Sequence, residues 1–198
     1  KVRNRGFEFA LTHRNTIGEV SYMVSANIAT NNNEITDLSS SNDIINNLEN
    51  GHGVAKYILR EGESIGSFYG FESDGLYTQE EIDAGHYYTY GGVTPNAGDT
   101  KFVPQRELDW GEEITDSDRT IIGCEVPDFT YGINLSVNYK NFEFSIFGQG
   151  ICGADVAFEV YQVHPFFHGQ DNPRRYHMGR WSEENPNPHA IYPRIYTA

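Results

Sequence analysis

The chain has 198 residues, with 28 acidic against 14 basic side chains and a formal net charge of −14 at pH 7. This balance argues against a nucleic-acid partner and against docking on anionic lipid, because both need clustered Lys and Arg. No apolar run reaches the roughly 18 residues of a transmembrane helix, but a barrel strand needs only about 9–11 residues of alternating polarity, so a membrane location stays open.

The first two predicted elements are strands with two different faces, at residues 5–12 and 19–31. Apolar and polar residues alternate along them with period two. One face carries Phe7, Phe9 and Leu11, then Val20, Tyr22, Val24, Ala26 and Ile28; the other carries Glu8, Ala10 and Thr12, then Ser21, Met23, Ser25, Asn27 and Ala29. Residues 13–18 are few enough to predict a hairpin between the two strands.

A long polar region, residues 32–127, follows and is expected to be a loop with short helical turns. Residues 42–48 suit a short helix capped by Ser41 or Asn42. At residues 78–84, Thr78 is followed three positions later by Glu81. This spacing is that of a capping box, so a helical turn is predicted there.

Two more alternating strands are predicted at residues 128–139 and 142–158, with a turn at Lys140 and Asn141. Their apolar faces hold Phe129, Tyr131, Ile133, Leu135, Val137 and Tyr139, then Phe142, Phe144 and Ile146. A second long irregular region covers residues 159–198. Short turns at one end and long loops at the other are typical of a membrane barrel. We therefore expect an all-β fold, made of antiparallel strands of a transmembrane β-barrel.

An antiparallel sheet of a soluble sandwich has the same period and is the alternative fold. Three features favour the barrel. The face opposite the apolar one is small and uncharged-polar, and aromatic residues lie on the apolar face near strand ends, where a barrel has its girdles. In addition, about 95 residues separate the two strand pairs, far more than a usual connection within a compact domain.

Several segments, taken in order, resemble the SusC/RagA family of TonB-dependent outer-membrane transporters. The order and spacing of the matches make the set specific. The segments are residues 4–8 (NRGFE), 60–71 (REGESIGSFYGF), 72–77 (ESDGLY), 97–102 (AGDTKF), 114–123 (ITDSDRTIIG), 127–132 (PDFTYG), 149–150 (QG) and 180–186 (RWSEENP).

The resemblance implies a 22-stranded barrel with an N-terminal plug, located in the bacterial outer membrane. It also implies energy supplied by TonB, a SusD-like surface lipoprotein as partner, and import of oligosaccharides or peptides. Residues 1–198 would be part of one barrel domain, with outer loops at 32–127 and 159–198 and without the plug through which TonB acts. The start at Lys1, with no signal peptide, leads us to expect a piece of a larger protein.

An acidic stretch, residues 107–118 (ELDWGEEITDSD), resembles a calcium loop that the family often carries as D-x-N-G-D-G-x-I-x-x-x-D. Such a loop places oxygen ligands at positions 1, 3, 5, 7 and 12 and glycine at position 6. Four of these positions are filled by Glu107, Asp109, Glu113 and Asp118. Position 5 is glycine and position 6 is glutamate, so the pattern is degenerate. A plain acidic surface turn is therefore favoured, calcium binding at this loop is the alternative, and no other cofactor is expected.

Other chemistry-bearing residues give weaker patterns. His164 and His168 have the spacing of a zinc site, but Pro165 disfavours a helix through them, so surface histidines are expected. Cys124 and Cys152 fit either a disulfide or two buried thiols. Neighbouring acids occur at residues 80–81, 112–113 and 183–184, but adjacency does not make a glycosidase pair. No nucleophile elbow or phosphate loop is present. We predict no catalytic residue and no enzyme.

Aromatic side chains in the long loops are the favoured substrate- or partner-binding residues. They are Tyr87, Tyr88, Tyr90, Trp110 and Trp181. Tyr and Trp offer flat apolar faces with polar tips, which suit sugar rings or a protein partner. The alternative is that they pack the core of the loops themselves.

The sequence therefore predicts a fragment of an outer-membrane nutrient importer. A soluble β-rich module that binds glycans or proteins at the cell surface is the alternative. The two differ in where the apolar strand faces go. They point outward on a curved sheet in the importer, and into a closed two-sheet core in the module.

Overall fold

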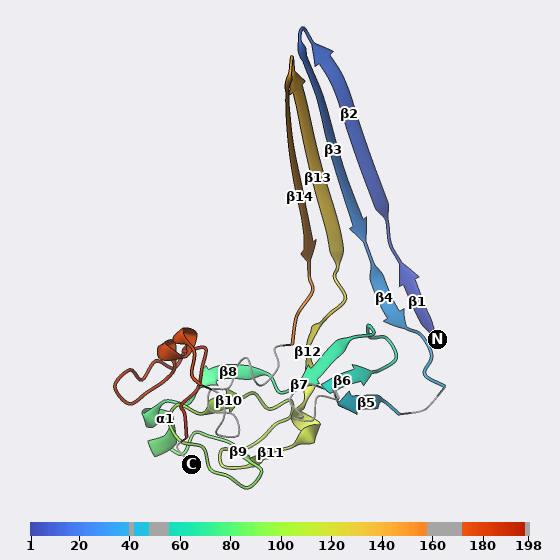
Figure 1. Ribbon diagram of the computed structural model, residues 1–198. Helices are drawn as coiled ribbons and strands as arrows, with labels where there is room; N and C mark the ends of the chain where they lie inside the picture. The colour runs from blue at the N-terminus through green and yellow to red at the C-terminus, as the bar shows by residue number, and fades with distance from the viewer. Residues whose placement is uncertain (40–41, 48–55, 158–171, 197–198) are drawn as a thin grey trace. The chain divides into compact units, whose positions relative to one another are not determined.

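The computed structural model describes residues 1–39, 42–47, 56–157 and 172–196, and it is built mainly of β-strands (Figure 1). The prediction of an all-β fold is confirmed. The chain divides into two compact units, each made of segments that are separate in the sequence. In the described part of the chain, no helix has the length and apolar character needed to cross a membrane.

The first unit contains a sheet of four long antiparallel strands, β2 (Glu8–Ile17), β3 (Val20–Thr30), β13 (Phe129–Tyr139) and β14 (Phe142–Cys152). Their order is β14-β13-β3-β2, so β2 and β14 form the two edges, and Figure 1 shows the strands side by side. These are the four strands predicted from the alternating polarity. The central pairing joins β3 to β13 and runs without a break from Thr30 opposite Phe129 to Val20 opposite Tyr139.

The ends of these strands differ from the predictions. The first hairpin turns at Gly18 and Glu19, because residues 13–17 pair with residues 20–24 and Gly18 adopts a φ of 60° that favours glycine. The fourth strand ends at Cys152, before Gly153 with a φ of 78°, and not at residue 158, which lies outside the described residues. The predicted turn at Lys140 is confirmed, and Lys140 has a φ of 53°.

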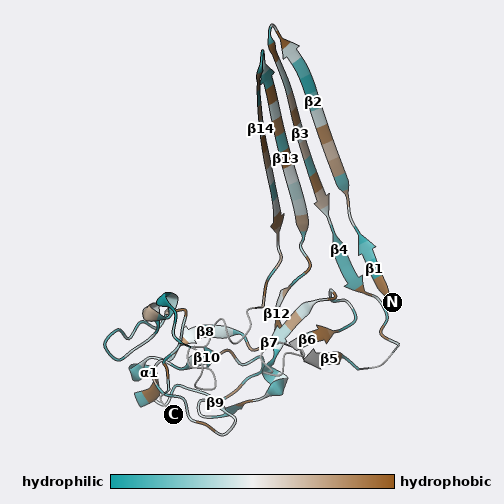
Figure 2. Cartoon of the chain, viewed as in Figure 1, coloured by the Kyte–Doolittle hydropathy of each residue, from teal (hydrophilic) through white to brown (hydrophobic). Residues whose placement is uncertain are grey.

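The strand register places apolar residues in rows that run across the sheet. Two rows have apolar residues on three strands, one with Phe9, Ile28 and Tyr131 and another with Val24, Leu135 and Ile146, and a third is apolar on all four strands, with Ile17, Val20, Tyr139 and Phe142. Since side chains alternate between faces, these rows share one face of the sheet. Figure 2 shows the hydrophobic residues distributed as bands along the strands. The apolar side chains are not enclosed, since Phe142 is 78% exposed and Phe144 is 59% exposed.

The first hairpin continues into a shorter ribbon made of β1 (Val2–Arg5) and β4 (Asn32–Ile35), which pair antiparallel. Between the two parts, a Cβ on Gly6 would lie 2.0 Å from the carbonyl oxygen of Thr30, so only glycine fits there. The predicted boundaries at residues 5 and 31 were therefore wrong. Residues 32–35 pair as a strand, and the long loop begins after them.

A second four-stranded sheet has the order β12-β7-β6-β5, with β5 (Ile44–Asn47), β6 (Lys56–Leu59), β7 (Ser67–Gly70) and β12 (Thr120–Cys124). The helix predicted at residues 42–48 was wrong, because residues 44–47 form a strand. Ile44 and Ile45 are β-branched and favour an extended backbone, and a strand partner overrides the capping signal before them.

The second unit is built of short elements. β8 (Ser73–Leu76) pairs antiparallel with β10 (Thr100–Phe102), and β9 (Thr89–Tyr90) pairs parallel with β11 (Glu113–Ile114). The short 3₁₀ helices η1 (Asp116–Asp118) and η3 (Arg175–Gly179) and the helix α1 (Gln79–Asp83) complete it.

Helix α1 confirms the predicted capping box. The Glu81 N–H donates to Thr78 Oγ1 at 3.2 Å, and the Thr78 N–H donates to Glu81 Oε2 at 2.9 Å. Two otherwise unpaired backbone donors are satisfied in this way. The short helix is therefore fixed by its own N-terminal side chains.

Candidate functional site

Three side chains form an aromatic cluster on the second unit. The Trp110 ring stacks on the Tyr88 ring, with centroids 4.8 Å apart and planes 28° apart, and the His86 ring lies 5.2 Å from the Trp110 ring. Trp110 is 56% exposed, whereas Tyr88 is half-buried beneath it. Two of the five predicted aromatic residues, distant in sequence, are thus brought together on a surface.

Backbone hydrogen bonds fix the turn that carries Trp110. The Gly111 N–H donates to the Tyr87 carbonyl at 2.8 Å, and the Thr89 N–H donates to the Glu112 carbonyl at 2.9 Å. The Glu112 N–H closes the turn on the Asp109 carbonyl at 3.1 Å. Trp110 is therefore held against the segment that carries Tyr88, so the stacked pair is fixed before any ligand arrives.

The other predicted aromatic residues lie elsewhere. Tyr90 makes edge-to-face contacts with Phe71 and Phe102, with centroids 5.2 Å and 5.9 Å away. Tyr87 is half-buried and supplies its carbonyl to the turn. Trp181 is 7% exposed and packs in a core with Leu76, Ala97 and Ala190. The structure places Trp181 in the interior of the second unit, away from its surface.

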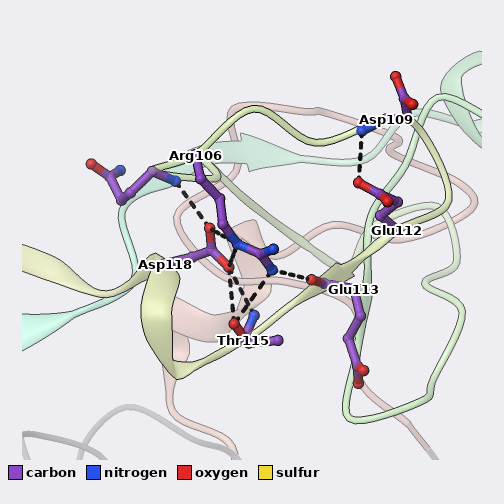
Figure 3. Close-up of polar contacts among 7 residues, drawn as sticks. Arg106, Asp109, Glu112, Glu113, Thr115 and Asp118 are labelled. Atoms are coloured by element: carbon purple, nitrogen blue, oxygen red, sulfur yellow. Dashed lines mark hydrogen bonds and ion pairs between the residues drawn. The ribbon is translucent and has the colours of Figure 1, made fainter.

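Asp118 is the last residue of the acidic stretch and is fully buried. Its carboxylate accepts hydrogen bonds from Arg106 Nε at 3.1 Å and 3.2 Å, from the Thr115 N–H at 2.9 Å and from the Gln105 N–H at 3.3 Å (Figure 3). Burial raises the pKa of this carboxyl, but the Thr115 N–H and the Arg106 guanidinium outweigh it and hold the pKa below its usual value.

The remaining acids of the stretch have separate partners. Glu112 Oε2 accepts the Asp109 N–H at 3.0 Å, and Glu113 Oε1 accepts the Gly92 N–H at 3.0 Å. Glu107 is exposed. Arg106 Nη2 donates to the Glu113 carbonyl at 2.9 Å, so one guanidinium contacts both Asp118 and Glu113 (Figure 3).

These oxygens do not fit a calcium site. In the described residues, no three His, Cys, Asp or Glu side chains gather closely enough to hold a metal ion. A calcium loop needs six or more oxygens that converge on one point, and here the most buried carboxylate is already saturated by donors. Sequence reasoning missed Arg106, although it directly precedes the acidic stretch and its charge is opposite.

The remaining candidates have simple placements. Cys124 and Cys152 are free and partly exposed, so they form no disulfide with each other. His164, His168 and Asp171 lie outside the described residues. His177 is buried, and its Nδ1 accepts the Arg174 N–H at 2.9 Å.

The surface around the aromatic cluster carries an excess of negative charge. Residues 69–122 contain twelve Asp or Glu and three Lys or Arg. Each of the three bases has an acidic partner: Lys101 lies 3.0 Å from Glu81, Arg106 3.1 Å from Asp118 and Arg119 2.8 Å from Asp116. The carboxylates of Glu107 and Asp109, next to Trp110, have no described basic partner. Two exposed acids without a described basic partner thus lie close to Trp110 in the sequence.

Comparison with known proteins identifies relatives across the whole length of the chain. No family model matches. TonB-dependent receptor P3 of Formosa agariphila is 32% identical over 198 residues, covering 98% of this chain and 19% of that receptor. TonB-dependent receptor P26 of the same organism is 29% identical over 191 residues, covering 93% of this chain and 18% of that receptor.

Two solved structures share the fold. The RagAB peptide importer in its open-open state has a TM-score of 0.63 at 18% identity, covering 99% of this chain and 20% of that one. The RagAB peptide transporter has a TM-score of 0.61 at 20% identity, covering 98% of this chain and 20% of that one. The chain thus spans about a fifth of the length of these relatives.

Proposed function

We propose that this chain, which belongs to the TonB-dependent receptors as a segment of one, is of the SusC/RagA type and forms part of the barrel wall and outer loops of a nutrient importer in the bacterial outer membrane. It is not an enzyme, as predicted, since its relatives are receptors and transporters. In this proposal, residues 1–198 belong to one barrel domain, and the four long strands continue into further strands at both edges.

One observation carries the proposal. Rows of apolar residues cross the long strands in register, one of them through all four strands, and their side chains are largely exposed. A soluble protein rarely leaves so wide an apolar face open to water. This apolar face is suited to contact with lipid. The opposite face, with Asn27, Asn134 and Ser136, is suited to line a water-filled lumen.

The edges of the sheet also support the barrel proposal. β14 is an edge strand of eleven residues, rich in Phe and Ile. Such an edge invites aggregation in water, and closure into a barrel removes it by pairing its free backbone groups. The alternative of a soluble module required the apolar faces to meet in a closed core, and the exposure of Phe142 and Phe144 disfavours it.

In the proposed importer, the second unit lies outside the membrane and takes part in recognition. A SusD-like surface lipoprotein would cover the outer loops, and TonB would act through the N-terminal part of the receptor. The substrate would be an oligosaccharide or a peptide. The exposed Trp110 and Tyr88 stack is the surface of this chain best suited to contact it.

The test uses two neighbouring residues of β14 that point to opposite faces. In the full-length receptor, first freed of its own cysteines, Phe144 or Ser145 is replaced by Cys and labelled with a fluorophore. After reconstitution, brominated lipid should quench the label at 144 strongly and the label at 145 weakly. Equal quenching at both positions would refute the placement of this sheet in a barrel wall.

A further inference from the structure

The chemistry around Trp110 narrows the class of substrate. Resting on the proposed import function, we propose that the exposed stack of Trp110 on Tyr88 binds a Lys or Arg side chain of an imported basic peptide. The aromatic stack supplies the binding face, and the surrounding carboxylates select its charge.

The geometry of the stack suits a cation. An ammonium or guanidinium group over an indole ring is attracted by the negative charge of the ring face, and Trp is the best of the aromatic side chains for this contact. Trp110 is more than half exposed, although its ring also contacts Tyr88 and His86. Because the turn is fixed by hydrogen bonds from Gly111 and Thr89, binding should cost little conformational entropy of the protein.

The charge around the stack separates the substrate classes. Glu107 and Asp109 lie within three positions of Trp110, are exposed, and have no basic partner in the described part of the chain. A sulfated or uronic-acid glycan would meet repulsion here, which costs affinity and slows association. A neutral sugar could use the aromatic face but would gain nothing from the carboxylates. A basic peptide uses both features.

The bases of residues 69–122 have carboxylate partners of their own. Lys101, Arg106 and Arg119 are the three Lys or Arg residues between positions 69 and 122, and each already contacts a carboxylate. Glu107 and Asp109 are exposed to solvent, and none of these three bases neutralises their carboxylates. Long-range attraction of this kind weakens as salt is added, which gives the proposal a separate readout.

The experiment measures binding to the full-length receptor in detergent. The probes are a short Lys-rich peptide, the same peptide with Glu in place of each Lys, and a neutral oligosaccharide of similar mass. The variants are Trp110→Ala, the pair Glu107→Gln with Asp109→Asn, and Glu80→Gln as matched control. Glu80 is an exposed acid on α1 of the same unit.

We expect the Lys-rich peptide to bind most tightly, and its affinity to fall about fivefold in Trp110→Ala and by a similar factor in the double variant. The Glu80→Gln variant should bind the peptide as tightly as the unchanged receptor does. Added salt should lower the affinity for the Lys-rich peptide but not the affinity for the neutral oligosaccharide. Equal affinity for the Lys and Glu peptides, or no loss in either variant, would overturn the inference.

Growth on peptides separates this inference from the function on which it rests. If deletion of the receptor gene leaves uptake unchanged, the importer proposal itself fails. If deletion abolishes uptake but the Trp110 and carboxylate variants keep their full preference, import stands and the charge selection fails. Circular dichroism of each variant shows that any loss is not a folding defect.

Discussion

The Arg106 guanidinium donates hydrogen bonds to the buried Asp118 carboxylate, with Nε 3.1 Å from one oxygen and 3.2 Å from the other. The same guanidinium reaches the Glu113 carbonyl, so it connects the middle of the acidic stretch to its last residue. An internal cation thus takes the part that a bound ion has in a calcium loop, and the loop should keep its structure without metal.

Replacing Arg106 tests this arrangement. Arg106→Met leaves a buried carboxylate without its counter-ion, and we expect the local unfolding free energy to fall by about 2 kcal/mol, below the range for wholly buried pairs because Arg106 is partly exposed. Arg106→Lys should recover only part, since one ammonium cannot bond both Asp118 and the Glu113 carbonyl. Hydrogen exchange of the Thr115 amide measures both. Rescue of Arg106→Met by calcium would show that the loop is an ion site after all.

The Asp118 carboxyl also sets an expected pH dependence. Its pKa is lowered in the folded state, so it binds a proton less readily there than in the unfolded chain. The resulting stability is present above the unfolded pKa of about 3.9 and is lost as pH falls through the lower, folded value. Hydrogen exchange around residues 105–118 should therefore quicken below about pH 4. Asp118→Asn should remove that acid transition, and an unchanged transition in this variant would assign it to another group.

Gly98 in the AGDTKF segment should tolerate no side chain. A Cβ there would lie 2.3 Å from Trp181 Cδ2, and the φ of 88° adds strain. We expect Gly98→Ala to lower the stability of the second unit by about 3 kcal/mol, combining overpacking and strain. Gly85→Ala is the control, because its φ is 73° but nothing lies within 4 Å, so about 1 kcal/mol is expected. Hydrogen exchange of the Tyr77 amide, bonded to Asp99, reports both.

A charge on either face of β14 should have unequal effects. Ile146 lies in an apolar row opposite Leu135, and Ser145 lies opposite Ser136 on the other face. In the full-length receptor in lipid vesicles, Ile146→Arg should lower the free energy of unfolding by about 2–4 kcal/mol, and Ser145→Arg by less than about 1 kcal/mol. Urea unfolding measures the difference. Equal losses would contradict the assignment of the two faces.

The long strands could be predicted because their signal is local. Period-two alternation and the short turn at Lys140 are properties of neighbouring residues, and they determine which face each side chain takes. The capping box of Thr78 and Glu81 is local in the same way. For these elements, tertiary contacts agree with the local preference, so the sequence alone was sufficient.

The rest depends on partners that are far apart in the chain. Trp181 is buried because it closes over Gly98, and a scan along the sequence cannot show that these positions meet. Residues 44–47 became a strand because a neighbouring strand overrode a capping signal. The role of Arg106 was missed because the acids were compared with a metal-binding pattern, which counts oxygens and ignores a nearby guanidinium.

The uninterrupted pairing of β3 with β13 also has a kinetic consequence. Each hairpin joins neighbouring residues and can close within about 10 μs, whereas Thr30 meets Phe129 only after the whole intervening segment is brought back on itself. The two hairpins should therefore form first, and β3 should pair with β13 later. Pulse labelling during refolding should protect amides within the β13–β14 hairpin before those shared by β3 and β13, and simultaneous protection would argue for a single concerted step.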